Sequence, residues 1–292
     1  MAVVPIIIPF YKEHEKLRQC RAAIAAQTWR ECETFVRDNT HDNILYTAAV
    51  NEGLAKYCYR PDVDYVVVLN QDAYMDPECV QRLVAFMEAT PDCGIACPVQ
   101  YQHSASTGQK QVTWGGSLRA WPTGVHRCDP FESYRDPFET YWANGACMMI
   151  RTRVVREIGQ FDANMRFICS DSDFAFTARA RGWGVYVVPQ ALCRHSLGAS
   201  GSPTNDFINL VKLRDAVYFT EKWLTGGLYR ALALEGPELT GPWIRQVLRK
   251  YKWNVTAMER KLGEHEPSPA DAWPSWLTEM HIPAQEARKK GF

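Results

Sequence analysis

The segment Tyr65-Val66-Val67-Val68-Leu69-Asn70-Gln71-Asp72 joins an apolar, mostly β-branched run to polar residues that follow it directly. Such a run is typical of a buried strand, and a carboxylate at the exposed end of a strand can hold a hard cation against a diphosphate. A plain Asx turn is the alternative that the last three residues leave open. The segment therefore predicts a buried strand over 65–69 and, with that alternative, a cation site at Asp72.

Strand and helix patterns alternate through the first hundred residues around this segment. The pattern predicts strands over 3–8, 33–36 and 65–69, and helices over 13–26, 44–58 and 77–88. Repeated βαβ units at this spacing indicate a parallel, doubly wound sheet, in which ligands bind at the carboxyl ends of the strands. We therefore expect site residues at 9–11, 38–40 and 70–72.

The rest of the chain is less regular. Residues 101–141 are rich in Gly, Pro, Ser and aromatic residues, which favours loops and short antiparallel strands. Beyond them the pattern predicts strands over 147–150 and 185–188, helices over 153–158, 171–181, 205–223 and 242–258, and an irregular tail from Glu264. Five aromatic residues of the irregular part can either stack on sugar rings or pack a core: Trp114, Trp121, Tyr134, Tyr141 and Trp142.

Composition narrows the class of protein. The 292 residues carry 33 basic and 33 acidic side chains, and a formal charge of zero argues against a broad electrostatic grip on nucleic acid. The longest apolar runs fall short of the roughly 18 residues that a membrane span needs, and the opening segment lacks the features of a signal peptide. Ten cysteines without a CxxC spacing indicate free thiols. We expect a cytoplasmic protein that does not bind nucleic acid.

Two later features carry chemistry. Asp171-Ser172-Asp173 opens a predicted helix, where acidic residues cap the helix dipole and the dipole favours their ionised form. Two carboxylates exceed the needs of a cap, so one of them is a candidate general base. His195 follows a strand and precedes the small-residue loop 196–201, which makes it a candidate metal ligand or phosphate contact besides a structural histidine.

Taken together, these positions resemble family 2 glycosyltransferases of the GT-A fold, especially the rhamnosyltransferase-like branch, from Val3 to Trp223. The matching motifs are Ile8-Pro9-Phe10-Tyr11, Asp38, Asn43 through Asn51-Glu52-Gly53, Asn70-Gln71-Asp72 at the Asp-x-Asp position, Gly145, Gly159-Gln160-Phe161-Asp162, Ser170-Asp171-Ser172-Asp173 and His195. Three positions depart from the family pattern: Asn70 replaces an Asp, Ser170 replaces a Glu, and Leu45 replaces a Gly.

The resemblance implies a GT-A-type, Rossmann-like, mostly parallel sheet flanked by helices, with a helical C-terminal extension. It implies a domain over 1–223, with a nucleotide-binding half at 1–100 and an acceptor-binding half at 101–223. The extension and tail then occupy 224–292. The residues expected to bind the donor nucleotide are Pro9, Tyr11, Asp38, Asn51, Asn70 and Gln71.

The activity implied is inverting transfer of a sugar from a nucleoside-diphosphate donor, of UDP or dTDP type, to a hydroxyl of a glycan or lipid-linked acceptor in polysaccharide biosynthesis. Asp171 matches the general base, and Asp72 and His195 match ligands of a divalent cation, Mn²⁺ or Mg²⁺. Gly145, Trp142 and Asp173 are expected to line the acceptor or sugar pocket.

Three alternatives stay open at this point. A non-catalytic module that binds nucleotide sugars would have no need of Asp171. A nucleotidyltransferase would need a glycine-rich loop after the first strand, and Pro9–Lys12 contains no glycine.

Along 243–251, apolar residues follow helical spacing with Arg245, Arg249 and Lys250 away from them. This helix either packs on the domain or contacts an anionic inner membrane peripherally.

Overall fold

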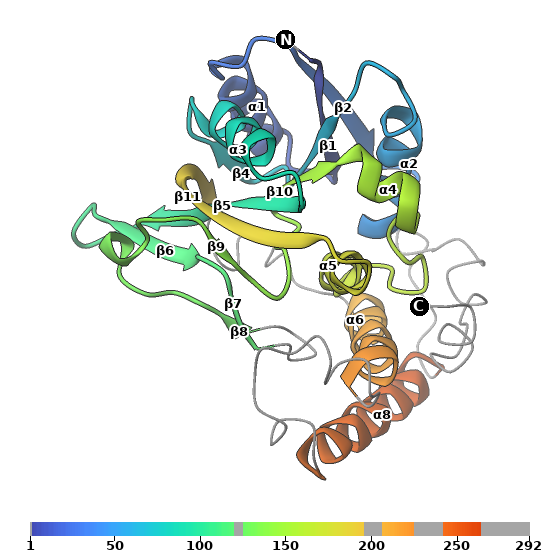
Figure 1. Ribbon diagram of the computed structural model, residues 1–292. Coiled ribbons are helices and arrows are strands. Elements are labelled where there is room, and N and C mark those ends of the chain that lie inside the picture. The colour runs from blue at the N-terminus through green and yellow to red at the C-terminus, as the bar shows by residue number, and fades with distance from the viewer. Residues whose placement is uncertain (1, 120–124, 196–205, 225–241, 264–292) are drawn as a thin grey trace.

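The computed structural model describes residues 2–119, 125–195, 206–224 and 242–263 (Figure 1). Its described strands are β1 (Val4–Phe10), β2 (Cys32–Asp38), β3 (Tyr65–Leu69), β4 (Ala73–Met75), β5 (Cys93–His103), β6 (Lys110–Trp114), β7 (Ser117–Arg119), β8 (Val125–His126), β9 (Phe138–Glu139), β10 (Cys147–Arg151) and β11 (Gly184–His195). A central sheet runs in the order β2-β1-β3-β10-β5-β11-β4, with β6 paired to β5 and β9 to β11. β7 and β8 form a separate two-stranded ribbon.

The sheet is mixed in direction. β1 pairs in parallel with β2 and β3, and β5 pairs in parallel with β11. Between these two parallel groups lies β10, which is antiparallel to both β3 and β5. The two predicted halves of the chain therefore contribute strands to one continuous sheet, because β10 and β11 come from the second half.

Helices cover both faces of the sheet. They are α1 (His14–Ala25), α2 (Leu45–Tyr57), α3 (Cys79–Ala89), α4 (Thr152–Ile158), α5 (Ser170–Ala180), α6 (Asp206–Phe219) and α8 (Pro242–Gly263), with a 3-10 turn η1 (Phe131–Ser133) and a π turn η2 (Thr220–Leu224). Side chains alternate along a strand. Ile6 and Ile8 therefore pack with α1 and α3, while Ile7 packs with α2, α4 and α5 on the opposite face (Figure 1).

The predicted sheet flanked by helices is confirmed, and the strand over 65–69 has the predicted bounds. The sheet is mixed and not mostly parallel as expected, because β10 and the short strands β4, β6 and β9 pair antiparallel with their neighbours. The long strand β5 was not predicted, because Pro98 and Gln100 interrupt its apolar run. All ten cysteines are free, as expected. Trp121, the loop 196–201 and the tail from Glu264 lie outside the described residues.

The C-terminal helix α8 lies along α6, away from the sheet (Figure 1). Ion pairs join the two helices, with Arg214 2.6 Å from Glu259 and Lys261 2.7 Å from Asp206. The predicted apolar stripe is half-buried at Val247, Leu248 and Tyr251, whereas Arg249 and Lys250 are exposed. The side chains of Trp243, Ile244 and Arg245 lie outside the described residues. α8 is thus a helix packed on the domain.

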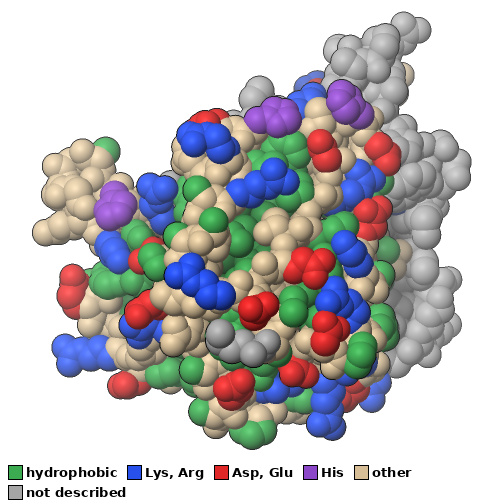
Figure 2. Space-filling view, turned by 90° about the horizontal axis from the view of Figure 1, so that it is seen from above, with side chains coloured by type: hydrophobic (Ala, Val, Ile, Leu, Met, Phe, Trp, Pro, Cys, Tyr) green, Lys and Arg blue, Asp and Glu red, His purple; other side chains and the backbone are tan. Residues whose placement is uncertain are grey.

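Two further observations concern the surface. Of the helices in the described ranges, none combines the length and the apolar character that a membrane crossing demands. On the face that Figure 2 shows, basic and acidic side chains are interspersed. Mixed signs of this kind produce no large single-sign field on that face.

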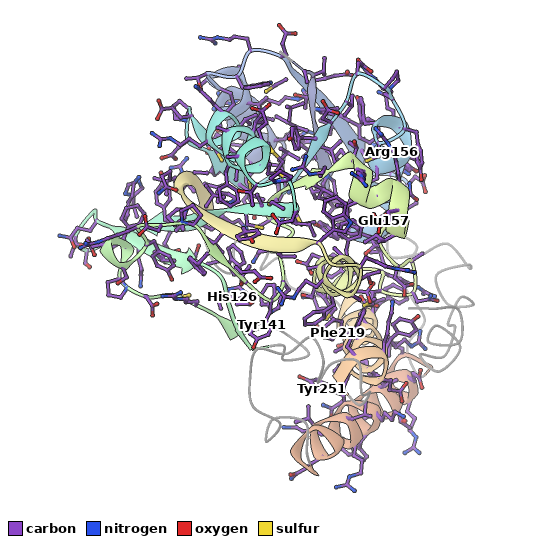
Figure 3. All side chains as sticks on the ribbon, in the orientation of Figure 1. His126, Tyr141, Arg156, Glu157, Phe219 and Tyr251 are labelled. Atoms are coloured by element: carbon purple, nitrogen blue, oxygen red, sulfur yellow. The ribbon has the colours of Figure 1, made fainter. Side chains whose placement is uncertain are left out.

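A buried ion cluster ties α5 to the C-terminal end of α6. Lys222 Nζ lies 2.7 Å from Asp173 Oδ1 and 2.8 Å from Asp162 Oδ2, and its side chain is 1% exposed. Trp223 Nε1 donates a further hydrogen bond to Asp173 Oδ1 at 2.6 Å. Phe219 (Figure 3) packs the same junction. Its ring stacks on that of Phe176, with ring centroids 5.8 Å apart. The cluster leaves each buried charge with an opposite partner, which a low-dielectric interior requires.

Lys222→Met should therefore destabilise the protein strongly, because it leaves the buried carboxylate of Asp173 and the half-buried carboxylate of Asp162 without their cation. Breaking a buried pair in this way costs about 3–5 kcal/mol. Urea unfolding followed by tryptophan fluorescence measures the change. Lys252→Met is the matched control, because its partner Glu221 lies in an exposed ion pair and such pairs contribute about 1 kcal/mol or less. Equal losses in the two variants would contradict the assignment.

Candidate active site

The carboxyl ends of β1, β2 and β3 meet at one edge of the sheet. The N–H of Asn39 donates to the carbonyl of Phe10 at 2.8 Å, which places Asp38 beside the end of β1. The N–H of Tyr11 donates to Gln71 Oε1 at 2.6 Å, which joins the ends of β1 and β3. Pro9 lies within the last residues of β1, opposite Arg37. Tyr11, Asp38 and Gln71 therefore gather where the sequence predicted a nucleotide.

Asp38 is exposed at this edge. Hydrogen bonds from Thr40 lower the pKa of the Asp38 carboxyl, and the N–H of Thr40 donates to Oδ1 at 2.8 Å. The carboxylate is thus ionised near neutral pH and can accept hydrogen bonds from N–H donors of a ligand.

The turn before β10 joins this edge to α5. The N–H of Asn70 donates to the carbonyl of Ala146 at 2.9 Å. The next residue back, Gly145, donates its N–H to Asp171 Oδ2 at 2.8 Å and accepts a hydrogen bond from the Tyr46 hydroxyl at 3.0 Å. A Cβ at Gly145 would lie 2.3 Å from the Tyr46 oxygen. A larger residue here would therefore displace the Tyr46 hydroxyl from its contact with this turn.

Asp171 is half-buried in the first turn of α5. Its Oδ1 accepts the N–H of Ser172 at 2.8 Å, while Oδ2 accepts the N–H of Gly145. Burial raises the pKa of Asp171, although the hydrogen bonds from Gly145 and Ser172 work in the opposite direction. Burial therefore opposes the helix dipole, which favours the ionised form as the sequence predicted. A carboxylate with a raised pKa binds a proton more strongly, as a general base must.

Asp72 and His195 lie side by side. β4 pairs antiparallel with β11 so that Ala73 is opposite His195, and the neighbouring Asp72 is 6% exposed. Asp72 Oδ1 lies 3.7 Å from His195 Nε2, a nitrogen that is buried and has no hydrogen-bond partner in the described part of the chain. Burial lowers the pKa of His195, which favours the neutral imidazole. A neutral ring nitrogen facing a carboxylate oxygen suits a divalent cation.

Asp72 and His195 could each supply one ligand to the predicted metal. No group of three or more His, Cys, Asp or Glu side chains in the described ranges is arranged to hold a metal. The remaining ligands of a cation at Asp72 and His195 would therefore be diphosphate oxygens and water, which Mg²⁺ commonly keeps.

Three predicted site residues make internal contacts instead. Asn51 Nδ2 donates to the carbonyl of Phe161 at 2.8 Å and its Oδ1 accepts the N–H of Phe161 at 3.0 Å, so Asn51 links α2 to the segment after α4. Asp173 belongs to the buried ion cluster with Lys222. Trp142 is 3% exposed and packs between Trp114 and His126. These side chains make contacts within the fold, and their expected ligand contacts stay predictions.

The structure adds residues that the sequence analysis did not single out. Tyr46 holds Gly145, as described above. His126 on β8 (Figure 3) lies within electrostatic range of Asp171 and His195, and its Nδ1 donates to the carbonyl of Thr113 at 3.2 Å. His126 had no signal, because its segment showed no regular pattern. Leu45 has φ +64°, a conformation that glycine adopts readily. That φ explains why the family usually has Gly there.

The chain belongs to glycosyl transferase family group 2, whose model matches residues 65–261. It is therefore a glycosyltransferase. Two Mycobacterium tuberculosis proteins, from strains CDC 1551 / Oshkosh and ATCC 25618 / H37Rv, are each named N-acetylglucosaminyl-diphospho-decaprenol L-rhamnosyltransferase. Each is 22% identical over 241 residues, which cover 68% of this chain and 78% of the relative.

A crystal structure of GalNAc-T7 with UDP, GalNAc and Mn²⁺ has a similar fold, with a TM-score of 0.54 and 13% identity. The match covers 91% of this chain, which spans 59% of the length of that protein. The likeness confirms the predicted GT-A-type architecture.

Proposed function

We propose that this protein transfers a sugar from a nucleoside-diphosphate donor to an acceptor hydroxyl with inversion at the anomeric carbon. The observation that carries the proposal is the position of Asp171. Its half-buried carboxylate is held 2.8 Å from the N–H of Gly145, in the turn that borders the strand edge with Asn70, Gln71 and Asp72. A candidate base and a candidate diphosphate site are thereby brought together.

The donor nucleotide is proposed to bind along the ends of β1, β2 and β3. Asp38 presents an ionised acceptor that suits the N–H of a pyrimidine base, as in a UDP or dTDP donor. Tyr11 is 40% exposed and offers an aromatic surface beside it. Pro9 and Asn70 complete this edge, where Asn70 supplies hydrogen bonds and no charge.

Asp72 and His195 are proposed to hold a divalent cation, Mn²⁺ or Mg²⁺. The solved GalNAc-T7 structure contains Mn²⁺ together with UDP, which supports this part of the proposal by analogy of fold. When bound, such a cation stabilises the negative charge of a departing diphosphate. The protein's share is to present one carboxylate oxygen and one neutral ring nitrogen, 3.7 Å apart, at the strand edge.

Asp171 is proposed to accept the proton of the acceptor hydroxyl as that hydroxyl attacks the sugar. The raised pKa of Asp171 favours this transfer, because a stronger base gains more from taking the proton. Attack from the face opposite the departing diphosphate inverts the anomeric carbon. Gly145 orients Asp171 Oδ2 by its N–H, and Tyr46 in turn orients Gly145.

The rival function is a module that binds nucleotide sugars without transferring them. Such a module would use Asp38 and the strand edge, but it would gain nothing from a buried carboxylate whose burial disfavours its charged form. The placement of Asp171 therefore favours the transferase.

The acceptor is proposed to be a lipid-linked glycan. This rests on the two mycobacterial relatives, whose name states a diphospho-decaprenol acceptor. The outward side of α8 suits peripheral contact with an anionic inner membrane, because Trp253 is 71% exposed and Arg249 and Lys250 precede it by one helical turn. This places the membrane contact opposite the stripe that packs on α6.

Asp72→Ala should abolish the Mn²⁺-dependent part of nucleoside-diphosphate binding, because the alanine removes the carboxylate ligand. Calorimetry with UDP and dTDP, with and without Mn²⁺, measures the loss. Asp64→Ala is the control, since Asp64 is exposed just before the opposite end of β3. Nucleotide affinity that responds to Mn²⁺ equally in both variants would refute the metal assignment.

Asp171→Asn should lower the transfer rate by about 10²- to 10⁴-fold, or about 3–5 kcal/mol of barrier, because the amide cannot accept the proton. Donor binding should persist. The wild-type rate should fall as pH drops through the raised pKa of Asp171, where the base becomes protonated. That acidic limb should be absent from the Asn variant. Near-normal transfer by the variant, or loss of donor binding, would remove Asp171 from the role of base.

Liposome co-sedimentation tests the outward side of α8. Wild-type protein should bind vesicles rich in anionic lipid at low salt and dissociate as salt rises, because the contact is electrostatic. Arg249→Glu with Lys250→Glu should reduce binding at least tenfold, since each basic residue contributes about 1 kcal/mol near such a surface. Trp253→Ala should reduce it as well, whereas Tyr59→Ala, another exposed aromatic, should not. No wild-type binding at low salt would rule the contact out.

A further inference from the structure

Gln100 is a polar residue at the centre of the sheet. It lies on β5 between Val99 and Tyr101, is fully buried, and is opposite Trp114 on β6 and Cys193 on β11. A buried amide in an apolar strand is costly unless its polar atoms have partners. The hydrogen-bond partners of Gln100 therefore decide whether its burial is tolerated.

The contact that Gln100 makes is with His195. Gln100 Oε1 lies 3.1 Å from His195 Nδ1. A carbonyl oxygen can only accept a hydrogen bond, so Nδ1 must carry the hydrogen. A neutral imidazole has one such hydrogen, and Nε2 is then left with a lone pair.

The lone pair of Nε2 faces Asp72. The 3.7 Å between Nε2 and Asp72 Oδ1 is too long for a hydrogen bond, and Nε2 is buried without another partner among the described residues. With the ring neutral, Nε2 and Asp72 Oδ1 are two electron-rich atoms that repel unless a cation lies between them, whereas a proton on Nε2 would instead pair the ring with Asp72 as an imidazolium. In the other tautomer, the lone pair of Nδ1 would face the oxygen of Gln100. The amide of Gln100 thus selects which ring nitrogen is turned toward Asp72.

The backbone at His195 is held from the same side. Thr113 on β6 donates its hydroxyl hydrogen to the carbonyl of His195 at 2.9 Å. Together, β5 and β6 fix both the main chain and the ring of this histidine.

We propose that Gln100 is a positioning residue, which holds His195 in the Nδ1–H tautomer so that Nε2 and Asp72 together present a divalent-cation site. The inference deepens the proposed function and rests on its metal site. Partners of this kind behind a ligating histidine change metal affinity by about 10- to 100-fold when they are removed.

A matched pair of substitutions tests the role of the acceptor atom. Gln100→Met keeps the length of the side chain but removes the acceptor, and it should weaken Mn²⁺ binding about 10- to 100-fold. Gln100→Glu keeps a side-chain oxygen that accepts from Nδ1–H when the carboxyl is ionised, and at a pH where it is ionised the variant should bind Mn²⁺ at least as tightly as the wild type. Gln102→Met, the same change two residues along β5, should leave the affinity unchanged. Electron paramagnetic resonance of free Mn²⁺, without nucleotide, measures all four proteins.

Two results would overturn the inference: Mn²⁺ affinity of Gln100→Met equal to that of the wild type, or a Glu variant that loses as much affinity as the Met variant. Circular dichroism of the metal-free variants separates a folding defect from a binding defect.

The tautomer can also be read directly in wild-type protein without metal. Nitrogen-15 NMR of the histidine side chains, with the His195 signal assigned through His195→Gln, should show a protonated Nδ1 and an unprotonated Nε2. An Nε2–H tautomer would overturn the inference whatever the variants do. Asp72→Asn should remove Mn²⁺ binding and leave this tautomer in place. Absence of Mn²⁺ binding in the wild type, with the expected tautomer present, would instead refute the proposed metal site alone.

Discussion

The antiparallel position of β10 between β3 and β5 is the constraint on which the candidate site depends. A strand parallel to β3 would end at the edge where β3 ends, and the chain would enter it from the opposite edge of the sheet. Because β10 runs the other way, it is entered from the ligand edge, and its preceding turn lies against Asn70 through the bond to Ala146. Gly145 is in that turn, and its N–H donates to the Asp171 side-chain Oδ2 at 2.8 Å, which joins α5 to the strand edge.

Helix geometry then divides the two carboxylates of α5. Successive residues of an α-helix are rotated by about 100°, so residues two apart point to nearly opposite sides. Asp171 faces Gly145 and Tyr46, whereas Asp173 faces Lys222 and Trp223 in the interior. Burial raises the pKa of both carboxyls. Asp173 has Lys222 as an ion-pair partner, whereas Asp171 accepts hydrogen bonds from the uncharged N–H groups of Gly145 and Ser172. The same short motif therefore supplies a candidate base and a structural anchor.

The neighbourhood of His195 retains polar groups that the fold does not satisfy. In the described part of the chain, His195 Nε2, Gln100 Nε2 and Trp114 Nε1 are buried without hydrogen-bond partners. Leaving such a group unsatisfied costs about 1–3 kcal/mol. Gln100 and Trp114 are opposite each other on β5 and β6, and Gln100 contacts the histidine, so these groups gather on one side of the site. A fold selected for stability alone would replace them with apolar residues. Their presence is consistent with a binding site in which a bound ligand supplies the missing partners.

The sequence by itself determined the buried strand 65–69, the alternating strands and helices of the first hundred residues, and the residue types at their ends, because local periodicity and turn chemistry are properties of short segments. It also pointed to Asp72, Asp171 and His195, although these lie far apart along the chain. Only the tertiary structure decided that Asp72 is beside His195 and that Asp173 is turned inward against Lys222, because strand order and helix rotation are set by packing between distant segments. The same holds for Gln100, whose partner lies 95 residues away on a strand paired with its own.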